Sequence, residues 1–401
     1  MKKNRHKEGN RNLSREMEGR NPTYARPLRI LFILEYYPPH VGGGETLFRD
    51  LAAGLVAAGH SCEVVTARLA GTPVYEERDG AKIHRVRVPK KGDRHWFTFF
   101  ALPLCLKLAR EADVIHTMTY NAALPAWLAA RMRRKPALIL VHEVLGRSWK
   151  DLGFSPALSS LYRFLEALVL ALPFDAYPAN SRATFKALAR SGVGLSRLRL
   201  VYPGVDRSLF SAPPKIPRRR IREALEIPHD APVALYFGRP GHAKGVHVLV
   251  KAAALVRDIL PDFRLLLVLS PDPPAGFKRV KALADALPPG LAFIIPPVDR
   301  GLLPSFLAAS DVVCVPSLTE GFGFTCAESC AARVPVVATC AGSIPEVISG
   351  AFVLVPPDSP QALAVGIVKA LLGRSLKSPL KHFDSASMVA GHADLYRRLC
   401  P

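Results

Sequence analysis

Several features that define common protein classes are missing from this 401-residue sequence. No apolar run reaches the ~20 residues that are needed to cross a bilayer. The longest apolar stretches, 96–106 and 165–174, are shorter, and each contains a proline. The N-terminal segment MKKNRHKEGNRNLSR also lacks the apolar core of a secretory signal. We therefore predict no transmembrane helix and a cytoplasmic location.

Paired cysteines and metal-binding patterns are absent as well. The seven cysteines include no Cys-x-x-Cys pair and have no histidines at metal-ligand spacing. We interpret them as reduced thiols that are mostly buried. Cys326 and Cys330 would share one helix face, where they could form a metal or redox pair, although simple packing accounts for the spacing. We accordingly expect no metal.

Acidic residues are scarce relative to basic ones. The chain has 54 Lys and Arg against 33 Asp and Glu, a formal charge of +21. This excess favours anionic partners such as phosphates, acidic lipid headgroups or nucleic acid, without choosing among them. Residues 1–26 are basic and show no apolar period, so we predict a disordered basic tail there. Much of the excess lies on the folded part, where solvated surface charge is the simplest explanation.

Short apolar runs alternate with amphipathic segments from Leu28 onward, which is typical of βαβ units around a parallel sheet. They predict a first Rossmann-like domain, residues 27–207. Its expected strands are 28–35, 61–67, 81–89, 113–117, 137–143 and 197–202, with helices at 46–58, 122–133 and 181–191.

A second series follows a connection rich in proline and charge at 206–231. It predicts a second Rossmann-like domain, residues 208–377, and then a helical segment, 378–401, that packs back on the first domain. The fold class is α/β, with two parallel sheets facing a central cleft. The expected strands are 233–238, 263–269, 291–296, 312–316, 335–339 and 352–356, with helices at 245–259, 301–309, 325–332 and 385–400.

Glycines and cations mark two loops where strands are expected to end. Three consecutive glycines at 42–44 precede a helix, so the backbone can approach a ligand and the helix N-terminus can attract a phosphate. The pattern GxGxxG is absent, which argues against a nicotinamide or flavin fingerprint. In the second domain, Arg239 and Lys244 lie at the carboxyl end of a strand and suit a diphosphate.

The densest signal is PSLTEGFGFTCAES, in which Glu320 and Glu328 are separated by seven residues. Gly321 and Gly323 leave backbone N–H groups free to bind oxygen ligands. Glu328 is expected one turn into a helix, and a carboxylate there can accept from two neighbouring hydroxyls, as in ribose binding. A capping or solvated pair of glutamates is the structural alternative.

These segments together resemble glycosyltransferase family four, whose members have the two-domain GT-B fold. The likeness runs in the family's order from Leu28 to Pro356. It is carried by YYPPHVGGGE, DVIH, the His142–Glu143 pair, YPGVD, FGRPGHAKG and the Glu-x7-Glu segment followed by PVVATCAGSIPEVI.

The resemblance implies a role for each matching residue. Glu328 would hold the ribose hydroxyls and Glu320 the hydroxyls of the donor sugar, while Arg239 and Lys244 would bind the diphosphate. His142 would lie near the anomeric carbon across the cleft. Backbone contacts to the donor would come from Gly43, Gly44, Gly321, Phe322 and Gly323.

The resemblance also implies a reaction and its substrates. A sugar would pass from a nucleotide-diphosphate donor to an acceptor with retention of configuration, the departing phosphate helping to take the acceptor proton. No cofactor or metal is expected. The resemblance does not give the acceptor. The basic surface would suit a membrane lipid, a lipid-linked saccharide or a phosphorylated small sugar, and we expect peripheral contact with an anionic membrane at the inner face of the cell membrane.

Two departures and three alternatives accompany this prediction. Family members commonly have a glycine-containing turn where this chain reads LSPDPPAGF, and the C-terminal part is short. A GT-B hydrolase, epimerase or phosphorylase could use the same diphosphate site. A nucleic-acid-binding protein and a catalytically silent subunit are the non-enzymatic alternatives. We expect no nucleic-acid partner, since no basic motif is interleaved with aromatics.

Overall fold

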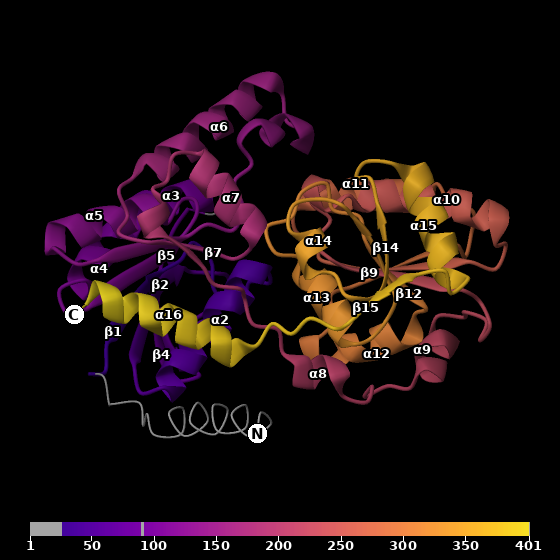
Figure 1. Cartoon of the computed structure of the whole chain (residues 1–401), viewed down its shortest axis with the longest axis horizontal. Coiled ribbons are helices and arrows are strands. Elements are labelled where there is room, and N and C mark those ends of the chain that lie inside the picture. The colour runs from indigo at the N-terminus through magenta and orange to yellow at the C-terminus, as the bar shows by residue number, and fades with distance from the viewer. Residues whose placement is uncertain (1–25, 90–91, 401) are drawn as a thin grey trace, which may run out of the picture.

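The computed structural model describes residues 26–89 and 92–400, which form two α/β domains lying side by side (Figure 1). The predicted basic tail lies outside the described residues, apart from Arg26. Two parallel-dominated sheets, each the centre of one domain, agree with the predicted fold class.

The first domain is built on a six-stranded sheet with the order β3-β4-β2-β1-β5-β6. Alternate residues of the central strand enter different cores: Leu31 and Ile33 face one, and Ile30 and Phe32 face the other. The sheet is therefore covered on both faces, as a parallel sheet requires. The strands are β1 (Arg29–Ile33), β2 (Ser61–Ala67), β3 (Tyr75–Arg78), β4 (Ala81–Val86), β5 (Val114–Met118) and β6 (Ala137–Leu140), with a separate pair β7 (Tyr177–Ala179) and β8 (Leu198–Leu200).

Helices surround this sheet and lead from one strand to the next. The first of them, α2, begins at the triple glycine and supplies buried Leu47, Phe48 and Leu51 to the core. The helical elements of this domain are α2 (Gly43–Ala57), α3 (Asp93–Phe100), α4 (Leu102–Leu108), α5 (Ala123–Arg133), η1 (Gly146–Leu152), α6 (Pro156–Ala171), α7 (Arg182–Arg190) and η2 (Leu195–Arg197).

The second domain has a seven-stranded sheet with the order β11-β10-β9-β12-β13-β14-β15. Only β15 pairs antiparallel, at the edge. The strands are β9 (Val233–Gly238), β10 (Arg264–Leu269), β11 (Ala292–Ile295), β12 (Val312–Val315), β13 (Val336–Thr339), β14 (Gly350–Val355) and β15 (Leu376–Ser378). The helical elements are α8 (Arg207–Ser211), α9 (Arg218–Ala224), η3 (His242–Lys244), α10 (Val246–Ile259), α11 (Pro274–Asp285), η4 (Arg300–Leu302), α12 (Leu303–Ala309), α13 (Phe324–Ala331), α14 (Ile344–Val347) and α15 (Pro360–Leu371).

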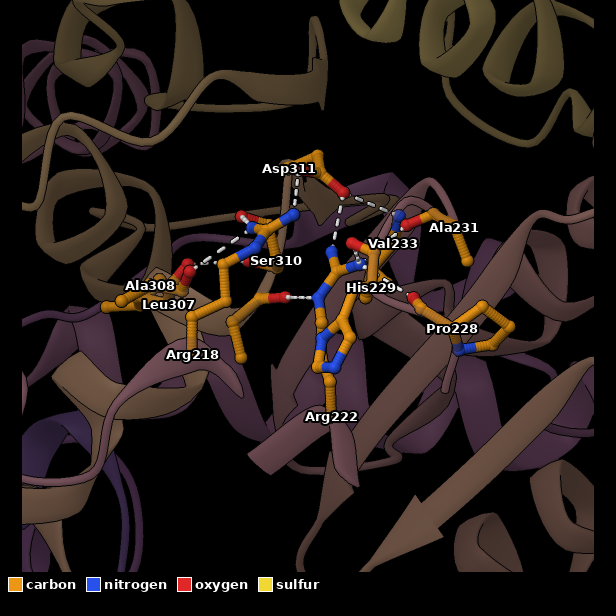
Figure 2. A network of polar contacts seen from close by, with 11 residues as sticks. Arg218, Arg222, Pro228, His229, Ala231, Val233, Leu307, Ala308, Ser310 and Asp311 are labelled. Atoms are coloured by element: carbon orange, nitrogen blue, oxygen red, sulfur yellow. Dashed lines mark hydrogen bonds and ion pairs between the residues drawn. The ribbon is translucent and has the colours of Figure 1, made fainter. Parts of the chain in front are cut away.

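The connection between the domains is fixed to the second sheet by a buried arginine (Figure 2). The Arg222 side chain on α9 donates to the carbonyl oxygens of Pro228, His229, Ala231 and Ala309 and to the Asp311 carboxylate. A guanidinium carries five N–H donors, so these contacts satisfy it in a fully buried position. The segment that reads as a linker is therefore packed onto the starts of β9 and β12.

The chain returns to the first domain at its end. Helix α16 (Ser385–Leu399) leaves the second domain and lies along α2 (Figure 1). Met388, Leu395 and Tyr396 are buried in the core of the first domain, and Tyr396 Oη lies 2.7 Å from His116 Nδ1 of β5. The last helix thus ties the two domains together.

Several elements are missing from the sequence prediction. The edge strand β3 has the sequence YEER, in which no run of apolar residues signals a strand. Helices α3, α4, α6, α11 and α15 were not predicted either; α6 reads as an apolar stretch because its outer face, described below, is apolar too.

The cysteines are free in this structure, as the sequence predicted. Five are buried, Cys400 is half-buried and Cys340 is exposed. Among the helices of the described residues, none combines the length and apolar character of a membrane span.

Candidate functional site

The loop after β9 brings Lys244 to the segment that carries Glu320. Gly245 follows Lys244 with a φ of +65°, and a Cβ there would lie 1.9 Å from the carbonyl oxygen of Pro316. Only glycine fits both the backbone angle and this contact. The cationic loop is thus packed directly against the end of β12, as the carboxyl edge of a parallel sheet allows.

Lys244 and Glu320 form the central ion pair of the site. Lys244 Nζ lies 2.8 Å from both carboxylate oxygens of Glu320, and Ser317 Oγ donates to Oε2 at 3.0 Å. The Glu320 carbonyl oxygen accepts from the backbone N and the hydroxyl of Ser343. Glu320 is held at both its backbone and its side chain, so the carboxylate has a fixed position.

Glu328 lies on α13 and is largely buried. Arg300 Nη2 donates to its Oε1 at 3.0 Å, and no partner for Oε2 occurs among the described residues. Burial raises the pKa of Glu328 to about 7, although the Arg300 guanidinium opposes this. Arg300 also lies 3.7 Å from Asp50 of α2, so this group reaches the first domain.

The glycine-containing loop leads into α13 without a side-chain cap. Gly323 occupies the N-cap with a φ of +87°, so the first backbone N–H groups of α13 remain open to an anion. The Phe322 ring is buried against Phe324 and Phe383. This leaves its backbone, rather than its ring, to meet a ligand.

His142 packs against Gly44 of α2 within the first domain, and its carbonyl oxygen lies beside Gly321 of the second domain. A Cβ on Gly44 would lie 2.7 Å from His142 Nε2, and one on Gly43 would lie 2.9 Å from the Phe324 ring. His142 Nε2 is buried and has no hydrogen-bond partner within residues 26–89 and 92–400. Burial lowers the pKa of His142, so the ring is neutral at neutral pH. It presents an unpartnered ring nitrogen in the cleft.

Glu143, the next residue, touches the second domain. Its carboxyl group accepts a hydrogen bond from Thr319 Oγ1. Burial, with the nearby Glu320 charge, raises the pKa of Glu143 to about 8, against the opposing Lys244. Glu143 is therefore mostly protonated at pH 7 and is not an anionic base.

The domains also meet at Glu346 of α14. Its carboxylate accepts from the backbone N–H groups of Arg182 and Ala183 at 3.0 Å each and from Tyr202 Oη at 3.0 Å. Arg182 begins α7, so a residue of the second domain satisfies helix N-terminal donors of the first. The structure therefore shows the cleft with both walls in contact.

The structure separates Arg239 from the other predicted cation. Arg239 Nη2 lies 3.3 Å from Asp272, and Asp272 lies 3.9 Å from His40 Nε2 of the first domain. Asp272 belongs to the segment LSPDPPAGF, in which the sequence departs from the family pattern. Lys244 alone pairs with Glu320, while Arg239 pairs with this segment.

Sequence reasoning missed three residues of this region. Arg300, Asp272 and Glu346 each form an ion pair or hydrogen bonds that hold the cleft, and none lies at a spacing that signals a site. Glu346 stands inside the quoted segment PVVATCAGSIPEVI, which is the only signal that could have pointed to it. The described part of the chain has no group of three or more His, Cys, Asp or Glu residues that could hold a metal ion.

Two family models match consecutive halves of the chain. "Glycosyltransferase Family 4" matches residues 41–209, and "Glycosyl transferases group 1" matches residues 217–383. The two matches meet near the connection held by Arg222 and together include the residues of the cleft.

Curated relatives share both halves. A D-inositol 3-phosphate glycosyltransferase of Pseudarthrobacter chlorophenolicus is 34% identical over 346 residues, which covers 77% of this chain and 76% of the relative. The protein of the same name from Jonesia denitrificans is 27% identical and covers 83% of each chain. The match to that of Xylanimonas cellulosilytica, at 32% identity, spans 59% of this chain and 57% of the relative.

Solved structures share the fold. Sucrose-phosphate synthase from Thermosynechococcus elongatus superposes with a TM-score of 0.75 at 24% identity, covering 93% of this chain and 99% of that one. Anabaena HepE in complex with UDP and glucose has a TM-score of 0.74 at 20% identity, covering 92% and 100%. These similarities extend over both domains.

Proposed function

This chain belongs to glycosyltransferase family 4 and is a nucleotide-sugar-dependent hexosyltransferase with the GT-B fold; we propose that it retains the anomeric configuration and that its acceptor bears a phosphate. The observation that carries the proposal is the pairing of Lys244 with Glu320 beside the open N-terminus of α13. A cation, a carboxylate and free N–H groups then meet where a sugar diphosphate can bind.

The proposed donor site works by exchange of partners. A diphosphate placed beside α13 would bring negative charge to Lys244, which would leave Glu320. The freed carboxylate could then accept hydrogen bonds from hydroxyls of the donor sugar. Arg239 would exchange Asp272 for phosphate in the same way. Fixed cations stabilise the charge that develops on the leaving phosphate.

Glu328 is proposed to bind the ribose. Its Oε2 has no partner in the described residues, while Arg300 holds Oε1. One oxygen is thus positioned by the protein and the other is available for a hydroxyl. Gly43, Gly44, Gly321, Phe322 and Gly323 would contribute backbone contacts around the same donor.

The protonation states in the cleft support retention without a covalent enzyme intermediate. Glu143 is mostly protonated at pH 7, and His142 is neutral with no acid bonded to its ring. Neither side chain is therefore an anionic nucleophile that could form a covalent bond to the sugar. The departing phosphate is then the proposed proton acceptor, with attack on the face that it leaves. No metal is part of this proposal, since Lys244, Arg239 and α13 supply positive charge.

The acceptor is proposed from charge and from the relatives. The curated relatives are named for D-inositol 3-phosphate, which bears a phosphate. The chain carries a formal charge of +21, which favours anionic substrates. UDP is the first donor nucleotide to test because HepE is described in complex with UDP-glucose.

A nucleotide screen and product analysis test this function. We expect thermal stabilisation by one of UDP, GDP and ADP, and by its α-linked sugar conjugate, without added metal. With a phosphorylated acceptor, proton NMR of the product should show an α linkage. A β linkage would overturn retention. Sugar released to water, with no acceptor product from any phosphorylated polyol or lipid, would favour the hydrolase alternative.

A further inference from the structure

Helix α6 exposes an apolar stripe on the first domain. The side chains of Leu161, Phe164, Leu165 and Leu168 are 49%, 59%, 41% and 49% exposed. Their spacing of i, i+3, i+4 and i+7 places them on one face of the helix. Figure 1 shows α6 at the top of the first domain, and none of the elements labelled there lies above it. This outer face, here called the α6 stripe, is too apolar for a solvated helix.

A cationic groove lies beside the same helix. It has a volume of about 910 Å³ and runs between α6, the loop after β6 and the end of α7. Arg147, Arg163, Arg190 and Arg197 line it. The first three have no hydrogen bond or ion pair with any described residue, and Arg197 donates only to a carbonyl oxygen and lies over a tyrosine ring.

Among the described residues that line this groove, the one acidic side chain, Glu166, already has hydrogen-bond partners within the chain. Glu166 is buried and accepts from the backbone N–H groups of Leu145 and Gly146, and from the Trp149 and Tyr120 side chains. Its charge is thus used to hold the loop that follows His142. The arginines are left for a ligand from outside the chain.

The groove and the α6 stripe share one helix, and this restricts the chemical class of ligand that can use both. Unpaired arginines in a concave site suit a phosphate, and an apolar helix face suits acyl chains. Leu170, Ala167 and Val193 supply an apolar lining to the groove itself. A soluble sugar phosphate would use the arginines and leave the stripe in water. A phosphate-bearing lipid uses both.

We propose that the groove between α6 and α7 binds the phosphate headgroup of a membrane lipid while the α6 stripe enters the bilayer interface. The inference rests on the proposed function, because it assigns the acceptor to a lipid phosphate. The lining of the groove begins at Val144, two residues beyond His142 in the sequence, so the groove includes part of the loop that follows the cleft histidine.

The test uses the full chain and vesicle flotation. The vesicles contain phosphatidylcholine alone, or with a matched minor fraction of phosphatidic acid or of oleic acid. Both additives are anionic, but only phosphatidic acid adds a phosphate monoester. We expect binding to follow the order phosphatidic acid, then oleic acid, then phosphatidylcholine alone.

Paired variants separate the groove from the stripe. Arg163→Gln with Arg190→Gln should lower partitioning to phosphatidic acid vesicles about tenfold to thirtyfold and abolish their advantage over oleic acid. Leu161→Ser with Leu165→Ser should lower binding to all vesicles by about tenfold. Arg220→Gln with Arg374→Gln, two exposed arginines of the second domain, removes the same charge as a control. It should leave the phosphatidic acid preference unchanged.

Three results would overturn the proposal. The first is a groove variant that keeps the same preference for phosphatidic acid vesicles as the Arg220/Arg374 control. The second is full competition with the vesicles by glycerol 3-phosphate in solution. The third is a stripe variant that keeps full vesicle binding. Titration of the wild-type chain and of each variant with UDP, GDP and ADP runs in parallel. If the wild-type chain bound none of UDP, GDP and ADP, the proposed function would be rejected, whereas nucleotide binding without vesicle binding would reject this inference alone.

Discussion

The donor site of the second domain and the groove of the first domain hold their positive charges in opposite ways. In the second domain, Lys244 and Arg300 each lie within 3.0 Å of a carboxylate. In the first, Arg163 and Arg190 line a groove with no acidic partner in the described residues. A ligand of the second domain therefore replaces one partner with another, while a ligand of the first meets cations that have no carboxylate partner among the described residues. The difference predicts specific recognition in one site and salt-sensitive attraction in the other.

Loss of Lys244 should have the largest effect. Lys244→Ala removes the cation proposed to stabilise the leaving phosphate, so kcat should fall by roughly a hundredfold to a thousandfold. Vesicle binding through the first domain should not change. Lys251→Ala, which removes an exposed lysine of α10, is the matched control. Equal kcat values for the two variants, measured by donor turnover, would show that the diphosphate site lies elsewhere.

A steric block between the domains should have the second-largest effect on turnover. A Cβ on Gly321 would lie 1.9 Å from the carbonyl oxygen of His142, so Gly321→Ala prevents the walls of the cleft from meeting as observed. A displacement of about 1 Å can cost on the order of a hundredfold in turnover. At Gly241 a Cβ meets no atom within 4 Å, and Gly241→Ala is the control. Full activity of Gly321→Ala would mean that the observed contact is not used in the reaction.

The side chains that meet around Lys244 could be located from the sequence more readily than those that line the groove of the first domain. Lys244, Glu320 and Glu328 stand in continuous motifs at strand ends, and the parallel sheet brings such ends together. The arginines of the groove come from η1, α6, the end of α7 and η2, and they meet only through tertiary packing. Arg300 could not be found for the same reason, since its carboxylate partner lies 28 residues away.

The helices and strands also differ in how well the sequence predicts them. Buried runs such as β9 (VALYFG) match the prediction residue by residue, because a parallel strand is apolar on both faces. The edge strand β3 and the helix α6 do not follow that pattern. β3 is charged because one side faces solvent, and α6 is apolar on a face that no described residue covers.

The two glutamates of the second domain should respond differently to neutralisation. Glu328→Gln should mainly weaken nucleoside diphosphate affinity, because a ribose contact is alike in ground and transition states. Glu320→Gln should mainly slow single turnover, because the donor sugar changes shape in the reaction. A charge-assisted hydrogen bond corresponds to about tenfold to a hundredfold. Loss of diphosphate affinity in Glu320→Gln alone would reverse the assignment.

A smaller effect is expected from pH at the contact between the domains. Burial, with Glu320 nearby, raises the pKa of Glu143 from its ordinary 4.5 to about 8, and Lys244 and Glu166 also act on it. The folded chain therefore holds this proton more tightly than the unfolded chain, and stability falls as pH rises between these values. The slope is at most about 1.4 kcal/mol per pH unit.

Glu143→Gln keeps the neutral form and should remove this slope. Thermal unfolding at pH 6, 7, 8 and 9 should show the wild-type Tm falling relative to that of the variant up to about pH 8. Glu111→Gln changes an exposed glutamate and should follow the wild type. Parallel curves for wild type and Glu143→Gln would mean that the Glu143 carboxyl is ionised in the folded chain.

Calorimetric titration with UDP, GDP and ADP in the presence of EDTA tests most directly whether the second domain holds a nucleotide donor without metal. The wild-type chain and the variants Glu328→Gln and Arg163→Gln with Arg190→Gln are titrated together. We expect one nucleotide to bind the wild type and the arginine variant equally, and Glu328→Gln at least about tenfold more weakly. Binding that requires a divalent metal, or that is lost in the arginine variant and kept in Glu328→Gln, would contradict a donor site around Lys244, Glu320 and Glu328.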